Sequence, residues 1–164
     1  MTGEARIKIY LAGPLGFSEA GRLFHAERII PALKALGHTL LDPWMDDGEA
    51  AAIAALPAGE ERRQAWRAFN SRIGHKNQLA IDACDMVLAV LDGTDVDSGT
   101  AAEIGYAFAR GKFVLGYRGD FRLSADNEAG IVNLQVEFFI RASGGDIIAT
   151  LDQLPGAISK LAPN

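Results

Sequence analysis

The feature that most constrains the fold is a short, continuously apolar run, MVLAVL at residues 86–91, that leads directly into an acidic loop. Such a run, with no polar alternation, is typical of a parallel strand buried on both faces. The loop DGTDVDSG occupies residues 92–99, and an alanine-rich segment that indicates a helix follows, with Glu103 in its first turns. This order of strand, acidic turn and helix predicts an α/β protein with its site at the carboxyl end of the strand.

Short apolar runs alternate with longer helical stretches along the whole chain, which is the pattern of βα units. We expect strands at residues 7–12, 38–41, 86–91 and 112–117, and a short edge strand at 147–149. We expect helices at residues 18–36, 60–83 and 133–142, a helix that carries Glu103 and ends at Arg110, and a last helix capped by Thr150. Residues 46–60 are expected to form a mobile flap or a short helix. The buried face of the 60–83 helix is predicted to consist of Trp66, Phe69, Ile73 and residues 79–81.

These elements predict a flavodoxin-like, doubly wound α/β fold: one five-stranded parallel sheet with helices on both faces, in a single domain over residues 1–164. The expected strand order is 2-1-3-4-5. In this order the strands are added toward one edge of the sheet and then toward the other, and the switch point lies between strands one and three. The loops that leave those two strands are residues 13–17 and 92–99. The sequence therefore predicts that they meet at one crevice.

Composition narrows the possible partners. A net charge of -5 with no basic stripe argues against a nucleic-acid footprint, which needs clustered Lys and Arg. No apolar run approaches the roughly 20 residues that span a bilayer, and the single cysteine, Cys84, has no disulfide partner in the chain. No Cys or His cluster has metal-ligand spacing, and Gly13-x-x-Gly16 is too short for a dinucleotide fingerprint. We therefore expect a cytoplasmic protein without a membrane partner, a metal or a cofactor.

Glu103 is the strongest candidate for chemistry at the crevice. A carboxylate can attack an electrophilic sugar carbon and form a glycosyl ester, which divides one difficult displacement into two easier ones. A position near a helix N-terminus would favour its ionised form by about 0.3–1 kcal/mol. The alternative is structural, because Thr100-x-x-Glu103 also has capping-box spacing. Asp92, Asp95 and Asp97 could each be turn residues, but together with Glu103 they favour a polar, hydroxyl-rich ligand.

Several segments form a recognisable series: IYLAGPLGFS at 9–18, DMVLAVLDG at 85–93, DVDSGTAAEIGYA at 95–107, GKFVLGYRGDFR at 111–122, and DN and NL at 126–127 and 133–134. By these motifs the chain resembles the nucleoside 2-deoxyribosyltransferase family. The resemblance implies that Glu103 attacks C1′ of a deoxynucleoside and expels the base. An acceptor base, or water, would then resolve the covalent 2-deoxyribosyl ester with retention.

The resemblance also implies roles for other residues. Asp97 matches an aspartate that holds the deoxyribose and its 5′-hydroxyl, and Tyr10 matches an aromatic residue that orients the nucleophile. Asn133 matches an asparagine that binds the same hydroxyl in a neighbouring subunit's site, which implies a homo-oligomer. Gly13 to Phe17 would line the base pocket. The structural alternatives are strand packing for Tyr10, a hydrophobic staple for Phe17 and an N-cap for Asn133.

One residue departs from the family pattern. Many members carry an aspartate that assists the leaving base where this chain has Asn77, and an amide cannot deliver a proton as a carboxylic acid does. A nearby carboxyl such as Asp42, or water, could supply that proton instead. Trp44 could stack on the base or simply anchor the 46–60 segment.

Two other functions fit the same motifs. In nucleoside 5′-monophosphate N-glycosidases of this fold, small hydroxyl residues surround the phosphate, and Ser98 and Thr100 could serve in that role. Asp97 argues against them, because its charge would repel a 5′-phosphate. The other possibility is a non-catalytic sensor of nucleotide derivatives, which the presence of Glu103 disfavours.

Overall fold

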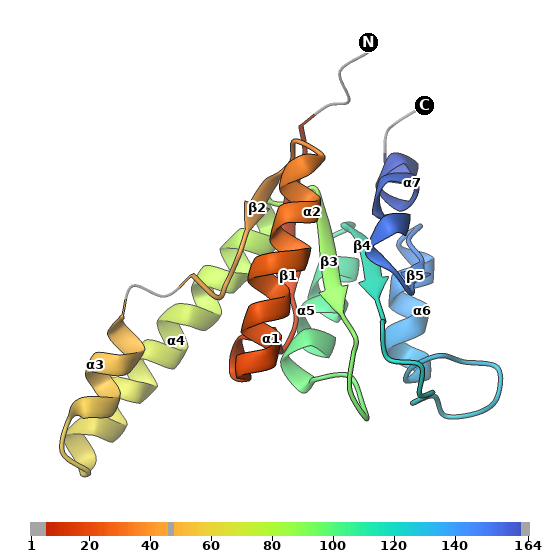
Figure 1. Cartoon of the computed structure of the whole chain (residues 1–164). Coiled ribbons are helices and arrows are strands. Elements are labelled where there is room, and N and C mark those ends of the chain that lie inside the picture. The colour runs from red at the N-terminus through yellow and green to blue at the C-terminus, as the bar shows by residue number, and fades with distance from the viewer. Residues whose placement is uncertain (1–5, 46–47, 162–164) are drawn as a thin grey trace.

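A computed structural model describes residues 6–45 and 48–161, and Figure 1 shows their arrangement around one parallel sheet. The strands are β1 (Lys8–Ala12), β2 (Thr39–Leu41), β3 (Met86–Val90), β4 (Phe113–Tyr117) and β5 (Ile147–Ile148). Their order is β2-β1-β3-β4-β5, and every neighbouring pair is parallel. The predicted fold class and strand order are confirmed.

Helices connect the strands. They are α1 (Glu19–Phe24), α2 (Ile30–Ala35), α3 (Glu49–Ala55), α4 (Glu60–Ala83), α5 (Ser98–Ala109), α6 (Leu134–Ala142) and α7 (Leu154–Ile158). The predicted continuous helix over residues 18–36 is interrupted by a π-helical turn, His25–Ile29, that joins α1 to α2. Pro31 lies in the first turn of α2 and lacks an N–H, so the hydrogen-bond ladder must change there. Of the two predictions for residues 46–60, the short helix is the observed one over Glu49–Ala55, while residues 46 and 47 lie outside the described part of the chain.

The sheet is buried on both faces. Side chains of β1 and β3 alternate between two apolar clusters, and all five residues of β3 are buried. One cluster packs against α2 and α7 through Leu33 and Leu154, and the other against α5 and α6 through Ile104 and Ile140. This burial explains why the β3 sequence carries no polar residue.

Helix α4 departs from the predicted burial. It has 24 residues and is about 36 Å long at 1.5 Å per residue, about twice the span of a five-residue strand. Only its C-terminal part can therefore lie on the sheet, and Figure 1 shows its other end projecting beyond the sheet beside α3. Ile81 is buried as predicted, whereas Leu79 is 54% exposed, and Trp66 and Phe69 are half-buried. None of the helices in the described part of the chain is long and apolar enough to cross a membrane.

Leu88 tests the contribution of the central strand. Its side chain is 1% exposed in β3. Truncation to alanine removes apolar contacts and leaves a cavity, because the surrounding side chains can fill the space only in part. We expect Leu88→Ala to lower the free energy of unfolding by about 2–5 kcal/mol, measured by urea denaturation. Leu23→Ala is the control: Leu23 is 57% exposed in α1, and its truncation should change stability by about 0.5 kcal/mol or less. Equal losses in the two variants would contradict the assignment of the core.

Candidate active site

The loops after β1 and β3 meet at the carboxyl edge of the sheet. Ala12 pairs with Ala89 in the parallel ladder, so the two strands end side by side. A cavity of about 620 Å³ opens there, between these loops and helices α3, α4 and α5. It is lined by Gly13, Phe17, Pro43, Trp44, Met45, Glu49, Ala50, Phe69, Asn70, Arg72, Ile73, Lys76, Asn77, Asp97, Gly99, Thr100 and Glu103.

Glu103 is the best-organised polar group in this cavity. Its Oε1 accepts a hydrogen bond from the Tyr10 hydroxyl at 2.6 Å, and the Asn77 amide nitrogen lies at 3.5 Å from the same oxygen. Within the described residues, no hydrogen bond reaches Oε2. One carboxylate oxygen is thus held in place while the other remains available to a ligand.

Burial controls the ionisation of Glu103. Loss of solvent raises the pKa of its carboxyl above the usual range, and the negative charge of Asp97 adds to this effect. The hydrogen bond from Tyr10 acts in the opposite direction, because it stabilises the carboxylate. Burial and the Glu103 charge raise the pKa of Tyr10 as well, so Tyr10 stays protonated and acts as the donor.

Asp97 caps the helix that carries Glu103. Its Oδ2 accepts hydrogen bonds from the backbone N–H of Thr100 at 3.0 Å and from the Thr100 hydroxyl at 3.2 Å. Because α5 begins at Ser98, Glu103 lies in its second turn and does not contribute to the cap. The capping-box alternative for Thr100 and Glu103 is therefore wrong. The predicted preference for the ionised form is also not observed, because burial is the largest influence on the pKa of Glu103 and raises it.

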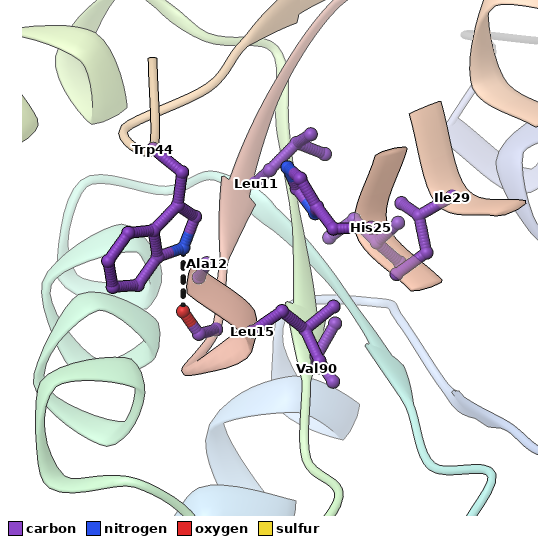
Figure 2. A pocket seen from close by; sticks show the side chains of 9 residues that line it. Leu11, Ala12, Leu15, His25, Ile29, Trp44 and Val90 are labelled. Carbon is purple, nitrogen blue, oxygen red and sulfur yellow. Dashed lines mark hydrogen bonds between the residues drawn. The ribbon is translucent and has the colours of Figure 1, made fainter. Parts of the chain in front are cut away.

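Aromatic side chains form one wall of the cavity. The rings of Trp44 and Phe17 meet edge to face, with 4.7 Å between centroids and an interplanar angle of 82°. The indole N–H of Trp44 donates to the carbonyl of Gly13 at 3.0 Å, the bond drawn in Figure 2. A Cβ on Gly16 would lie 1.9 Å from the Trp44 ring, so only glycine permits this contact. Phe69 and Ile73 of α4 also line the cavity, which gives it apolar surfaces for a flat ring.

Three predicted site residues are not part of the cavity lining. Tyr10 is fully buried and acts on the cavity only through its hydrogen bond to Glu103. Ser98 is the exposed first residue of α5. Asn133 caps α6, with its Oδ1 accepting from the backbone N–H groups of Gln135 and Val136 at 3.0 and 3.4 Å. The structural alternative for Asn133, an N-cap of its own helix, is thus present.

Asp42 also points away from the cavity. Its Oδ2 lies 2.9 Å from His25 Nε2, and its Oδ1 accepts from the backbone N–H of Trp44 at 3.0 Å. Burial alone would raise the pKa of Asp42, but these hydrogen bonds lower it below its usual value. An ionised, fully bonded carboxylate is not a suitable proton donor for a leaving base.

Sequence reasoning missed the polar residues that α4 adds to the cavity: Asn70, Arg72 and Lys76. Arg72 forms an ion pair with Glu49 of α3, across the mouth of the cavity. Asn70 lies seven positions before Asn77, two helical turns away on the same face, so helical spacing from Asn77 could have found it. Arg72 and Lys76 lie five and one positions before Asn77, outside that spacing. Among the described residues, no group of three or more His, Cys, Asp and Glu side chains is arranged to hold a metal ion.

A doubly wound sheet with a pocket at its switch point, a positioned carboxylate and an aromatic wall is the arrangement of an α/β enzyme. Comparison with known families makes the assignment more specific. The sequence model of the nucleoside 2-deoxyribosyltransferase family matches residues 9–139, and the chain belongs to this family of enzymes.

Solved structures share the fold. A 2-deoxyribosyltransferase from Leishmania mexicana is 25% identical, with a TM-score of 0.62, and the match covers 93% of this chain and 95% of that one. A 2-deoxyribosyltransferase from Bacillus psychrosaccharolyticus is 23% identical, with a TM-score of 0.60 and coverage of 90% and 89%. A CMP N-glycosidase from Clostridium botulinum is 18% identical, with a TM-score of 0.54 and coverage of 93% and 97%. No curated protein sequence matches the chain significantly.

The raised pKa of Glu103 predicts a cost in stability. The folded state keeps the proton to higher pH than the unfolded state, so this group's contribution declines as pH rises from the ordinary carboxyl range through the raised pKa. We expect Glu103→Gln to be more stable than the wild type at pH 7, because the amide is uncharged and can still accept from Tyr10. The advantage should disappear at pH values below the ordinary carboxyl range. Thermal unfolding at a series of pH values measures it.

Glu128→Gln provides the matched control, since Glu128 is an exposed carboxylate in the loop before α6. It should show no comparable gain at neutral pH. A gain for Glu103→Gln that does not vary with pH would mean that packing, and not the buried charge, is responsible.

Proposed function

We propose that the protein cleaves the N-glycosidic bond of 2′-deoxynucleosides and transfers the 2-deoxyribosyl group to an acceptor base through a covalent ester on Glu103. The observation that carries this proposal is the geometry of Glu103: Tyr10 holds Oε1 at 2.6 Å, while Oε2 has no partner among the described residues. Family membership supports the same reaction.

The chemistry follows from this geometry. Oε2 attacks C1′, the bond from C1′ to the base nitrogen breaks, and the electron pair leaves with the base, which takes up a proton from water. The second step reverses the first: a nitrogen of the acceptor base attacks C1′, loses its proton to water and releases the Glu103 carboxylate, so two inversions give retention. Burial favours the first step, because forming the ester removes a charge that the site solvates poorly.

The remaining residues suggest where the substrate lies. Asp97 uses Oδ2 for the helix cap, which leaves Oδ1 for a sugar hydroxyl. The aromatic wall of Phe17 and Trp44 suits a nucleobase, whose face stacks on such rings. Since Asn133 is absent from the cavity of its own chain, we propose a cytoplasmic homo-oligomer in which it reaches a neighbouring copy's site.

A 5′-phosphate suits this cavity poorly. Arg72 and Lys76 bring positive charge to the α4 side of the lining, but the α5 side, where Asp97 would meet the 5′ end of the sugar, carries the carboxylates Asp97 and Glu103. Ser98, one of the two hydroxyl residues suited to a phosphate, lies outside the lining. Like charges in close contact disfavour binding, so the unphosphorylated nucleoside is the better substrate.

Turnover by Glu103→Ala tests the mechanism. We expect the wild type to convert deoxyinosine or thymidine, with adenine as acceptor, into deoxyadenosine, and the variant to lose at least about a thousandfold in rate. Chromatography of the products measures both. Glu61→Ala, at an exposed position of α4, should keep wild-type turnover.

The products also separate the alternatives. Free deoxyribose without deoxyadenosine would indicate hydrolysis in place of transfer, and release of base only from 5′-monophosphates would indicate the glycosidase. Tight binding without any product would favour the sensor. Full turnover by Glu103→Ala would rule out the covalent mechanism.

Asn77→Asp tests the departure from the family pattern. The Asn77 amide nitrogen faces Glu103 Oε1 at 3.5 Å, so an aspartate there would place a second carboxyl beside the nucleophile. We expect the pH for half-maximal activity on the acid limb to rise, because a neighbouring negative charge raises the pKa of Glu103. We also expect rates and base preference to change, because the new carboxyl can deliver a proton to the base. Unchanged pH profiles, rates and preference would show that position 77 does not influence the reaction.

A further inference from the structure

A buried polar pair lies behind the aromatic wall of the cavity. His25 Nε2 is 2.9 Å from Asp42 Oδ2, and the two side chains are only 11% and 7% exposed. Figure 2 shows the His25 ring among apolar side chains, with Trp44 nearby. His25 comes from the π-helical turn after α1, and Asp42 directly follows β2. The pair therefore joins two segments on the same side of the sheet.

The pair is connected to Trp44 through Asp42. The second oxygen of Asp42 accepts the backbone N–H of Trp44 at 3.0 Å, so both carboxylate oxygens are used. Trp44 is then held again at its indole N–H, by the carbonyl of Gly13, and at its ring, by Phe17. The resulting chain of contacts runs from His25 through Asp42 to Trp44 and ends at the cavity wall.

Stability alone does not explain a polar pair at this place. A small void of about 10 Å³ lies beside His25 and Trp44, with Leu11, Ile29 and Val90 among the residues that line it. Apolar side chains of similar size would fill such surroundings without the cost of removing a carboxylate from water. Hydrogen bonds are directional, so they give the group that they hold a defined orientation, which apolar packing does not.

We propose that His25 and Asp42 are positioning residues that set the orientation of Trp44 and thereby determine how tightly the cavity binds a nucleobase. This inference rests on the proposed function for its substrate, since it assigns the base to the Trp44 wall. Neither residue lines the cavity, so both act through Trp44. The pair should affect base binding and leave the chemistry at Glu103 unchanged.

Fluorescence can follow Trp44 independently of activity. The chain has two tryptophans, so Trp66→Phe leaves Trp44 as the only one. In that background we would compare His25→Ala, Asp42→Ala and His25→Gln, whose amide can still donate toward Asp42. His75→Ala serves as the histidine control, because His75 is exposed on α4 and does not line the cavity.

We expect His25→Ala and Asp42→Ala to shift Trp44 emission to longer wavelength and to increase its quenching by iodide. Their KM for the deoxynucleoside should rise about three- to tenfold, which corresponds to the loss of one hydrogen bond. Their kcat should change less than about twofold. His25→Gln should keep the Trp44 emission and the KM close to those of the Trp66→Phe background, and His75→Ala should match that background. Circular dichroism checks that each variant is folded. If an alanine variant does not fold, His25→Gln still tests the proposal.

Unchanged emission and KM in the folded alanine variants would overturn the proposal. A shift in emission without a change in KM would overturn its second half, the link to base binding. If the wild type neither binds nor converts any nucleoside, the proposed function fails, and the emission and quenching data alone decide whether the pair positions Trp44.

Discussion

The parallel pairing of β1 with β3 determines where every candidate functional group lies. Ala12 opposes Ala89 at the ends of the two strands, so the loops that follow are neighbours although 74 residues lie between them in the sequence. Tyr10 of β1 can then reach Glu103 of α5, across 93 positions. Close approach is required as well: Gly13 has φ +156°, and a Cβ there would lie 2.9 Å from Val90 Cβ. The positions of the candidate site residues thus depend on the backbone geometry at this edge of the sheet.

Glu103 illustrates how a site can retain a group that the fold does not favour. Burial and Asp97 both disfavour its charged form, and a single short hydrogen bond from Tyr10 opposes them. Ester formation would relieve this electrostatic cost by removing the charge, which is why a poorly solvated carboxylate suits covalent catalysis on a sugar. Asp97 caps the N-terminus of the helix that carries Glu103 with one oxygen, and among the described residues no hydrogen bond reaches the other.

The walls of the cavity differ in how closely they are attached to the sheet. The loops after β1, β2 and β3 are fixed to the sheet, and the contacts from His25 to Trp44 extend that order to the aromatic wall. The opposite wall comes from α4, whose N-terminal half projects beyond the sheet and packs beside α3. The α4 wall of the cavity therefore depends on a helix that the main core holds at its C-terminal end, near Ile81.

The sequence by itself determined the alternation of strands and helices, the strand order, the crevice between two loops and the candidacy of Glu103, because buried parallel strands leave continuous apolar runs that can be read locally. It did not determine that Asn77 faces Glu103, that Asp42 turns toward His25, or that Leu79 of α4 is exposed. Each of these depends on which partner lies within about 3 Å, or on how far a long helix overlaps the sheet. Such distances arise only when segments far apart in the chain pack together, so the tertiary structure alone decided the bonds around Glu103 and the orientation of Trp44.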